Sequence, residues 1–500
     1  MSTTFIVTNT NDSGLGSLRQ AIIDANSSAS SGPFDIIFDP GVVGIITLTS
    51  GQISINKSMT IHGPGARVLT VSGNNTNRAF EIGVNSINVT INKLSINNCN
   101  NISGGSISNI FISTLIINEC NFYDNTSGVL GGAIDIQSGA ILRLFNSTFN
   151  NNSSNVQAGA INFFEGSGII GNCTFTNNSA AGPGGAIIIN SSVLSIINCT
   201  IYGNTANQGG GISLANNATL NIGNTIVSNN TAAGDPNIFV SSGNVNSSQP
   251  NYGTNFYNNT SGFTPGASDI INPAGPNLLA LGNYGGPTDT MLPNSGSPVI
   301  NVGTNTVFLN AALTNPELGT SFSNYRDQRD FHRFVGTIDI GADEFGSTSV
   351  CFSGKSLILT KNIQTNEIAE LPAKNVQSDL HHVFDVNTKS FIPIIYNIVT
   401  GPMTRFMRIK KDALGENKPN QDFYVTSGHN LWINNLEIKA KNIKVAKRVK
   451  VKSQNVYSIC TAEKTAILVN NIDVMTWGVD EFVNYSKNNN LLWSNNHILS

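Results

Sequence analysis

Charged side chains, aromatic rings and long apolar runs are scarce in this sequence of 500 residues. Asp, Glu, Lys and Arg together make up 11% of the chain, and aromatic residues make up 8%. No apolar run is long enough to cross a bilayer, which excludes a transmembrane helix from the expected structure. The N-terminus, MSTTFIVTNTNDSG, has no basic region followed by an apolar core, so we expect no secretory signal peptide.

Glycine and small polar residues are abundant instead. The chain has 48 glycines, and Asn, Ser and Thr supply most of its polarity, a mixture that favours turns and short strands over helices. The residues before Cys351 include 9 Lys+Arg and 18 Asp+Glu, whereas those from Cys351 onward include 18 and 12. The length and this change in charge predict two domains that divide near the cysteine.

An internal repeat of about 26 residues occupies the middle of the acidic part. Glycines recur in GGSI, GGAIDI, AGAINF, GGAIII and GGGISL, at Gly105, Gly132, Gly159, Gly185 and Gly210. Asparagines recur with the same period at Asn125, Asn152, Asn178, Asn204 and Asn229. This period is too short for a repeat of two helices and suits one coil of a parallel β-helix with three short strands per coil.

Stacked coils lie about 4.8 Å apart, so equivalent residues should form ladders along the solenoid. Two ladders should point inward: Ile134, Ile161, Ile187 and Ile212, and then Ile136, Phe163, Ile189 and Leu214. The repeated asparagines and glycines are expected at tight turns. A ladder of small residues should fill the interior, with reduced thiols favoured over disulfides: Cys120, Ser147, Cys173, Cys199 and Asn224.

Both ends of the repeat carry sequence of a different kind. Residues 8–26, TNTNDSGLGSLRQAIIDAN, have apolar residues at helical spacing and predict an amphipathic helix that covers the open end of the solenoid. The apolar positions are Leu18, Ala21, Ile22 and Ala25. The far end reads LLALGNYGGPTDTMLPNSGSPVIN and then DQRDFHRFVGTIDIGADEF. With these ends, residues 4–345 resemble the right-handed parallel β-helix proteins related to polymorphic surface and adhesin-like proteins. The resemblance implies an all-β, pectin lyase-like fold over residues 1–346, with end caps.

Many sugar lyases and hydrolases use a β-helix, but the repeat shows no pair of catalytic carboxylates. The main charged residues of the regular coils are Asp135, Arg143 and Glu165. The equivalents of Asp135 in later coils are uncharged, which favours solvated polar positions over a catalytic site. A cluster near the far end is interpreted as an ion-paired end segment: Arg326, Asp327, Arg329, Asp330 and Arg333. A surface glycan or a protein remains an alternative partner of the outer faces, and no cofactor or metal site is predicted.

From Ser349 onward the glycine turns end, and strands appear in which lysine alternates with Val or Ile, as in IKAKNIKVAKRVKVK. The alternation places the lysines on one face of a strand or hairpin. We interpret this face as solvated. No nucleic-acid partner is expected, because no aromatic residues are interleaved with the lysines and no recognition helix is predicted.

Three sequence blocks follow one another in the basic part. CFSGKSLILT opens it at Cys351, DFYVTSGHNLWIN carries Thr426 and His429, and VYSICTAEKTAILVNNIDVMTWG closes it. Together these blocks resemble the Hint (hedgehog/intein) self-processing family. The resemblance implies a junction at 347–350, a compact all-β Hint domain at 351–478 and a C-terminal tail at 479–500.

The resemblance also implies a reaction at the bond between Val350 and Cys351. The Cys351 thiol would attack the Val350 carbonyl and convert the peptide bond into a thioester. His429 would protonate the leaving nitrogen, and Thr426 would hydrogen-bond and distort the scissile amide. The implied catalytic residues are therefore Cys351, Thr426 and His429.

Splicing is not expected, because residues 474–477 read VMTW where splicing inteins have His-Asn. Ser458 stands where many inteins have an aspartate. We interpret Cys460 as a core residue in a strand, and the alternative is a part in a second acyl transfer. The thioester would then pass to water or to another hydroxyl or amine. The alternative is a structural, adhesive or glycan-binding β-helix protein with a degenerate Hint domain. The domain pairing resembles proteins of giant DNA viruses and of bacteria, which implies a virion or cell-surface location.

Overall fold

The computed structural model contains two compact units, and each is described by itself. The first comprises Met1–Ala311 and Asp327–Phe345, and the second contains Gly346–Ser500. In the first unit the structure describes residues 3–247, 252–284, 286–307, 327–329, 333 and 337–344. In the second it describes residues 352–353, 356–377, 380–385, 389–414, 418–425, 430–433, 436–439, 443–461, 466–469, 472–475, 477–478, 492–494 and 497–499.

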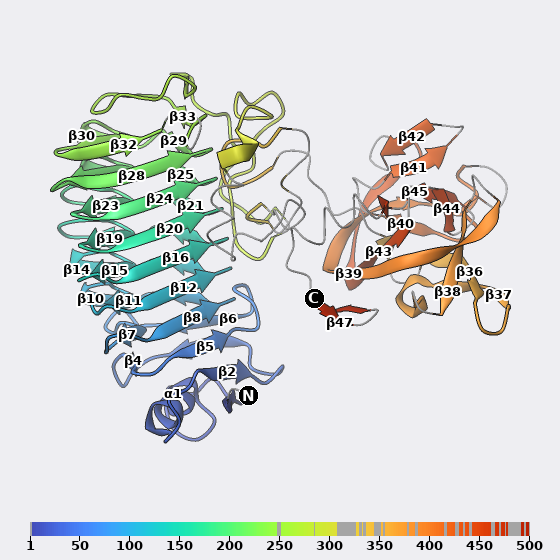
Figure 1. Ribbon diagram of the computed structural model, residues 1–500, viewed down its shortest axis with the longest axis horizontal. Helices are drawn as coiled ribbons and strands as arrows, with labels where there is room; N and C mark the ends of the chain where they lie inside the picture. Colours follow the sequence, from blue (N-terminus) through green and yellow to red (C-terminus); the bar gives the residue numbers. More distant parts are fainter. Residues whose placement is uncertain are drawn as a thin grey trace. The chain divides into compact units, whose positions relative to one another are not determined.

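The first unit is a parallel β-helix, as the repeat predicts, and its strands stack into four sheets (Figure 1). Sheet 1 contains β1 (Thr3–Val7), β2 (Phe34–Phe38), β5 (Met59–His62), β8 (Asn88–Asn92), β12 (Thr114–Asn118), β16 (Ile141–Phe145), β20 (Ser167–Gly171), β24 (Val193–Ile197), β28 (Ala218–Gly223) and β32 (Gly243–Asn246). Sheet 2 contains β3 (Gly44–Thr47), β6 (Leu69–Ser72), β9 (Ser95–Asn97), β13 (Asn121–Tyr123), β17 (Thr148–Asn150), β21 (Thr174–Thr176), β25 (Thr200–Tyr202), β29 (Ile226–Ser228), β33 (Phe256–Tyr257) and β34 (Ile270–Ile271).

Sheets 3 and 4 complete the coils. Sheet 3 contains β10 (Asn100–Ser103), β14 (Thr126–Leu130), β18 (Ser153–Ser154), β22 (Ser179–Ala180), β26 (Thr205–Gln208) and β30 (Thr231–Gly234). Sheet 4 contains β4 (Ile53–Ile55), β7 (Phe80–Ile82), β11 (Ile107–Asn109), β15 (Ile134–Gln137), β19 (Ile161–Phe164), β23 (Ile187–Asn190), β27 (Ile212–Ala215) and β31 (Ile238–Val240). The expectation of three strands per coil is therefore wrong for the central coils, which have four. The additional strand forms because the residues between the asparagine turn and the glycine pair are extended and pair with the same residues of the next coil.

The repeated glycines allow neighbouring coils to approach each other closely. A Cβ atom on Gly132 would lie 2.1 Å from Gly159 O, and one on Gly159 would lie 2.1 Å from Gly185 O. The left-handed residue of the turn is the preceding one, such as Gly131 with φ 57°. The turn is confirmed, but the repeated glycine itself is required by contact with the next coil rather than by its backbone angle.

The repeated asparagines form a buried ladder along the solenoid. Asn152 Nδ2 donates a hydrogen bond of 2.9 Å to Asn178 Oδ1, and Asn178 Nδ2 donates one of 2.9 Å to Asn204 Oδ1. The next member is Asn230, which accepts from Asn204 Nδ2 at 2.9 Å. The sequence alignment is therefore wrong by one residue at Asn229, which has a φ of 56° and occupies the left-handed position of that turn.

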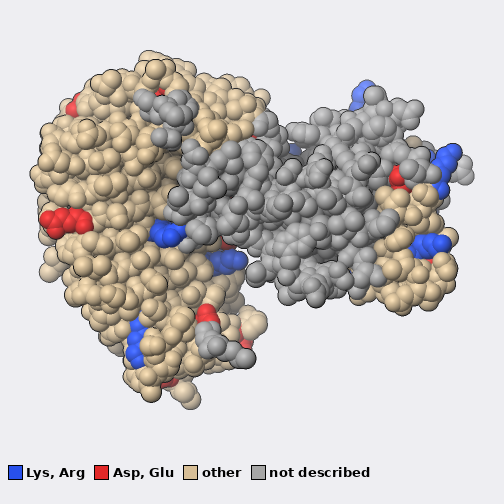
Figure 2. Space-filling model, in the orientation of Figure 1, with Lys and Arg blue, Asp and Glu red and all other residues tan. Residues whose placement is uncertain are grey.

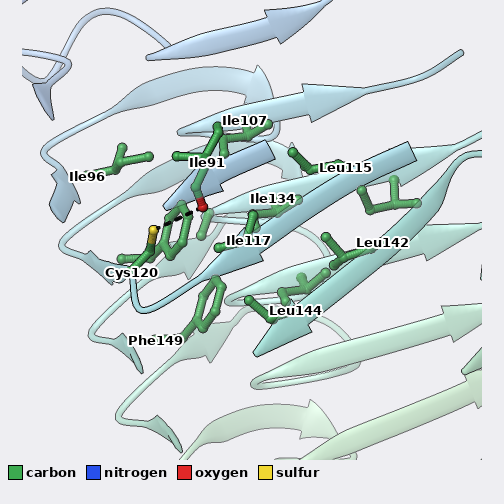
Figure 3. Packing of buried hydrophobic residues seen from close by; sticks show 14 of the residues in the cluster. Ile91, Ile96, Ile107, Leu115, Ile117, Cys120, Ile134, Leu142, Leu144 and Phe149 are labelled. Atoms are coloured by element: carbon green, nitrogen blue, oxygen red, sulfur yellow. Dashed lines mark hydrogen bonds between the residues drawn. The ribbon is translucent and has the colours of Figure 1, made fainter. Parts of the chain in front are cut away.

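Both predicted aliphatic ladders are confirmed by strand register and by complete burial. A stack of phenylalanines lies beside them, with ring centroids 4.6 Å apart for Phe122 and Phe149 and 4.8 Å apart for Phe149 and Phe175. The cysteines fill the interior as predicted, and Cys120 Sγ donates to Ile91 O at 3.5 Å (Figure 3). Asn224 does not belong to the cysteine ladder, however. Thr200 pairs with Ile226, which makes Thr225 the equivalent of Cys199.

Helix α1 (Leu18–Ser27) confirms the predicted cap. Its four expected apolar residues are buried, and it packs on β1 and β4 at the N-terminal end of the solenoid. Ser17 begins the helix, because its side chain accepts a hydrogen bond from the backbone of Gln20. No helix among the described residues is long and apolar enough to span a membrane.

The described residues 286–307, 327–329, 333 and 337–344, which we call the lateral segment, run along the outside of sheet 2 instead of covering its end. Thr148 Oγ1 donates to Asp289 O, and Ala342 N donates to Thr200 Oγ1 at 3.1 Å. Val299 and Ile340 form a small core with Ile226 of β29. The expectation of an end cap is therefore wrong for these described residues, because the outward threonines of sheet 2 supply lateral hydrogen-bonding partners.

The second unit is an all-β structure with mainly antiparallel pairing. Along its main sheet the strands are ordered β42 (Leu436–Lys439), β41 (Asn430–Ile433), β45 (Ile472–Met475), β44 (Ala466–Val469), β36 (Leu357–Asn362), β38 (His381–Asp385), β39 (Ser390–Ile409), β40 (Phe423–Val425), β35 (Phe352–Ser353), β43 (Lys447–Thr461) and β46 (Trp477–Gly478). β37 (Ile368–Pro372) pairs with β36, the short 3-10 helix η2 is Ala373–Asn375, and β47 (Leu492–Ser494) pairs with β48 (His497–Leu499). A separate apolar core, which includes Ile358, Val383 and Val469, holds this sheet together.

Candidate functional site

The predicted catalytic and cleavage residues Val350, Cys351, Thr426 and His429 lie outside the described residues. Their nearest described neighbours in the chain belong to β35, β40 and β41.

Strand β35 starts one residue after Cys351 and lies between β40 and β43 in the sheet. Phe352 pairs with Val425 on one side and with Tyr457 on the other, both in antiparallel register. Val425 is the last described residue before Thr426. The first and second sequence blocks are thus brought together at neighbouring positions of one sheet.

The closing block is paired with the same sheet. Cys460 of β43 pairs in parallel with Trp477 of β46, and Ser458 pairs with Ile398 of β39. Val474 pairs with Leu431 of β41. All three blocks therefore contribute strands to one sheet, although they are far apart in the chain.

Packing holds the central strands of this region in place. Val425 and Phe423 of β40 are fully buried, and Met407 of β39 packs in the same core. Met407 also pairs with Val425. A shift of β40 by one residue would turn its buried side chains to the opposite face, so the core fixes the register next to Thr426.

The cysteines of the solenoid have an environment that suppresses reactivity. Cys99, Cys120, Cys173 and Cys199 are unbonded and buried. Burial raises the pKa of the Cys99 and Cys120 thiols to about 12 and also raises the pKa of Cys173. Since the thiolate is the nucleophile, the raised pKa makes these three thiols packing residues, and Cys199 is buried in the same ladder.

Asp135 differs from the sequence expectation, because it is fully buried rather than solvated. Its carboxylate accepts hydrogen bonds of 2.7 Å from Asn162 Nδ2 and from Gln137 Nε2. The turn at Gly104 lies over it, since a Cβ atom there would be 3.0 Å from Asp135 Cβ. Burial raises the pKa of Asp135 to about 6, and its hydrogen bonds and the charge of Arg78 oppose that rise.

Arg78 is a buried cation that the sequence does not single out. It donates to Gly104 O at 3.0 Å and to Ser103 O at 2.7 Å, and it forms an ion pair of 3.2 Å with Glu81. Arg78 therefore joins the coil that contains β7 to the turn of the following coil. The group is a satisfied structural cluster and offers no free pair of carboxylates. Arg143 is half-buried and Glu165 is exposed.

The predicted ion pairing is confirmed for Asp327 and Arg329, while Arg326 and Asp330 lie outside the described residues. Arg329 is buried and forms ion pairs with Asp327 and, at 3.6 Å, with Asp343. Burial raises the pKa of Asp343 to about 7, against the opposing charge of Arg329. Arg333 is fully buried and donates to Ala342 O at 2.6 Å. The cluster therefore links residues 329 and 333 of the lateral segment to residues 342–343 of the same segment.

Gln328 fastens the lateral segment to the coils, and sequence reasoning missed it. Its amide nitrogen donates to Thr148 Oγ1 at 2.9 Å, and its Oε1 accepts from Thr174 Oγ1 at 2.6 Å. The sequence does contain a signal for this contact. Thr148, Thr174 and Thr200 recur at the coil period, each directly after a residue of the small-residue ladder, and could have indicated a segment bound to the outside of sheet 2. Across the described residues, no group of three or more His, Cys, Asp or Glu side chains is arranged to hold a metal ion.

Comparison with known proteins gives structural matches only. No protein-family model matches the chain, and no curated protein matches it. Among solved structures, a variant of the Ssp DnaB mini-intein is similar at 14% identity and a TM-score of 0.20, over 25% of this chain and 93% of that chain. A DnaB intein from Synechocystis sp. PCC 6803 is similar at 14% identity and a TM-score of 0.18, over 25% and 97%. We base no activity on likenesses at this level.

Proposed function

We propose that the second unit is a Hint-type self-processing domain that cleaves the bond between Val350 and Cys351 through a thioester, without splicing. The observation that carries the proposal is the pairing of Phe352 with Val425. These two residues are the direct chain neighbours of Cys351 and Thr426, so the first and second sequence blocks meet in one sheet beside the proposed residues.

The proposed reaction needs one nucleophile and one acid. The Cys351 sulfur attacks the Val350 carbonyl carbon, a C–S bond forms, and the C–N bond to Cys351 breaks. His429 gives the proton that converts the leaving nitrogen into an amine, and the thiol proton restores the acid. Positioned proton transfer of this kind accelerates a reaction about 10²- to 10⁴-fold. Water, or another hydroxyl or amine, then attacks the thioester and restores the thiol.

The absence of splicing follows from the closing block. Val474 and Trp477 pair with Leu431 and Cys460, and the sequence between them contains no asparagine. No side chain there can cyclise to release the C-terminal part. The proposed products are therefore residues 1–350 and a fragment that begins with Cys351.

For the first unit we propose the role of a surface or fibre-like protein that processing releases or attaches. The support is its continuous parallel solenoid and a surface with few charges, visible on the face drawn in Figure 2. The phenylalanine stack is fully buried, so it cannot provide the aromatic platform that would favour glycan binding. The solenoid is not proposed to be catalytic.

Intact-mass analysis of the full chain tests the proposal. We expect a fragment that ends at Val350, and faster cleavage when a thiol or hydroxylamine is added, because both attack thioesters. Cys351→Ala should abolish the fragment, and His429→Ala should slow its formation about 10²-fold or more.

Cys460→Ala is the matched control, because it removes a thiol from the same sheet without touching the proposed nucleophile. It should leave the site and rate of cleavage unchanged. An uncut chain in every condition would overturn the proposal and leave a structural β-helix protein with an inactive second unit.

A further inference from the structure

The second unit carries a dense group of basic side chains at one end of the β39–β43 ribbon. We call this group the basic patch, and it consists of Arg408, Lys410, Lys411, Lys444, Lys447, Arg448 and Lys450. Arg408 is half-buried and the other six are exposed. Asp412 and Asp422 are acidic neighbours of the patch in the chain, and Glu370 accepts a hydrogen bond of 3.2 Å from Asn420, which lies between them. Basic atoms are visible on the described surface of this unit in Figure 2.

The patch is built on anchored backbone. Lys410 and Lys411 follow Ile409, which is fully buried, and Lys444 follows Ile443, which is 8% exposed. Ile409 and Ile443 belong to the same apolar core. The turns that carry the lysines are closed by backbone hydrogen bonds, from Ala413 N to Lys410 O and from Ala446 N to Ile443 O. The cations are therefore presented from fixed positions.

Strand pairing sets like charges opposite each other. Arg408 of β39 pairs with Lys447 of β43. Like charges directly across a sheet destabilise it. Arg408 Nε, moreover, is buried and has no hydrogen-bond partner in the described part of the unit. If this face only contacted water, the repulsion between paired cations would remain uncompensated. A bound polyanion would offset that repulsion.

We propose that the basic patch binds the phosphodiester backbone of nucleic acid without reading its sequence. Duplex DNA carries one negative charge per about 1.7 Å of its axis, a density that suits seven cations gathered at one end of a ribbon. Recognition of bases would need aromatic or helical elements, whereas contact with the phosphodiester backbone needs only Lys and Arg. The lack of aromatic residues between the lysines therefore does not argue against this partner. A membrane surface fits less well, because Val445, at 42% exposed, is the one large exposed apolar side chain among the described residues of the two turns.

Fluorescence anisotropy of the full chain with a labelled DNA duplex of arbitrary sequence tests the proposal. We expect a dissociation constant of about 10⁻⁴ to 10⁻⁶ M near physiological salt, and a steep loss of affinity as salt rises. The double variant Lys447→Glu/Lys450→Glu should weaken binding about tenfold or more and reduce the slope of log K against log salt by about two.

The matched control is Lys374→Glu/Lys389→Glu, which reverses two exposed lysines of the same unit outside the patch. This control should bind within about twofold of the unaltered chain, because it changes the net charge equally and leaves every patch residue in place. Anionic phosphatidylserine vesicles and heparin are tested in parallel. Absence of duplex binding, an equal loss in both variants, or tighter binding of vesicles or heparin than of DNA would overturn the proposal.

Discussion

Asparagine serves two different positions in several coils of the solenoid, although Asp124 and Gly203 take the left-handed position in two others. Asn178 is buried, and its amide links the coils before and after it through hydrogen bonds with Asn152 and Asn204. Asn177, its neighbour, is exposed and has a φ of 55° that few other side chains tolerate. The paired asparagines of the sequence thus combine a left-handed turn with a continuous ladder.

Asp135 should make the stability of the solenoid depend on pH. Because its pKa rises from 3.8 to about 6 on folding, the folded state binds the proton more tightly than the unfolded state. Its contribution is therefore fully present below about pH 4 and is lost as the pH rises through about 6. Over this interval the ionisation of Asp135 should lower the free energy of unfolding by about 3 kcal/mol, and Asp135→Asn should abolish that decrease. Urea unfolding of both proteins at pH 4 and pH 7.5 measures the difference.

The charged groups that act on Asp135 remain in the variant, chiefly Arg78 and, through it, Glu81. Asn can accept from Asn162, and Gln137 can turn its amide to accept from the new Nδ2. Glu165→Gln, which alters an exposed carboxylate of the next coil, is the control. It should change the free energy of unfolding by the same amount at both pH values. Parallel pH dependence in the Asp135 variant and the unaltered chain would contradict the prediction.

The residue-scale expectations from sequence were accurate where the period alone decided them. The inward ladder through Ile134 and Ile161 needed only the strand alternation and the step between coils. Asp135 was misjudged because strand alternation points it outward, and only the turn at Gly104 buries it. Period counting also failed near Asn229 and Asn224, because the alignment used a step of 25 residues there, whereas Thr200 pairs with Ile226, a step of 26.

At the scale of strands and sheets, spacing between coils depends on the repeated glycine. Gly159→Ala would put a Cβ atom 2.1 Å from Gly185 O and 2.5 Å from Ser179 N, so β19 and β23 could not keep their pairing. We expect the free energy of unfolding to fall by about 3 kcal/mol or more, because both contacts are with backbone atoms that cannot move aside. Thermal unfolding followed by circular dichroism measures it.

Gly234→Ala provides the matched control at the end of β30, where a Cβ atom would meet nothing within 4 Å. It should change stability by less than about 0.5 kcal/mol. Equal effects of the two substitutions would show that glycine content, and not the approach of the coils, sets the stability.

The lateral segment is the element that sequence patterns described least well. Its motifs, including DQRD and DIGADEF, were expected to close the end of the solenoid, yet the described residues lie along sheet 2. The reason is that Thr148, Thr174 and Thr200 face outward at the coil period, and a hydrogen-bonding strip of this kind leaves no trace in hydrophobic periodicity. In the second unit, the order of the three blocks was predictable, but their meeting in one sheet was not.

For the whole molecule, two separate cores have a consequence for processing. The core of the solenoid and the small core around Ile340 consist of residues that precede 345, and the core of the second unit begins at Ile358. The ion pairs of Arg329 with Asp327 and Asp343 also precede the proposed cut. A break at Val350 therefore removes none of the described contacts that hold the solenoid together.

We accordingly expect the solenoid to unfold at the same temperature before and after cleavage, within about 2 °C, which corresponds to less than about 1 kcal/mol for a unit of this size. Calorimetry of the cleaved chain and of uncut Cys351→Ala measures it, and a specific protease site introduced between Phe345 and Val350 supplies the cut if the chain does not cut itself. A larger fall would mean that the second unit stabilises the solenoid. In that case processing would weaken the solenoid, whereas equal temperatures would mean that it leaves a fully folded β-helix.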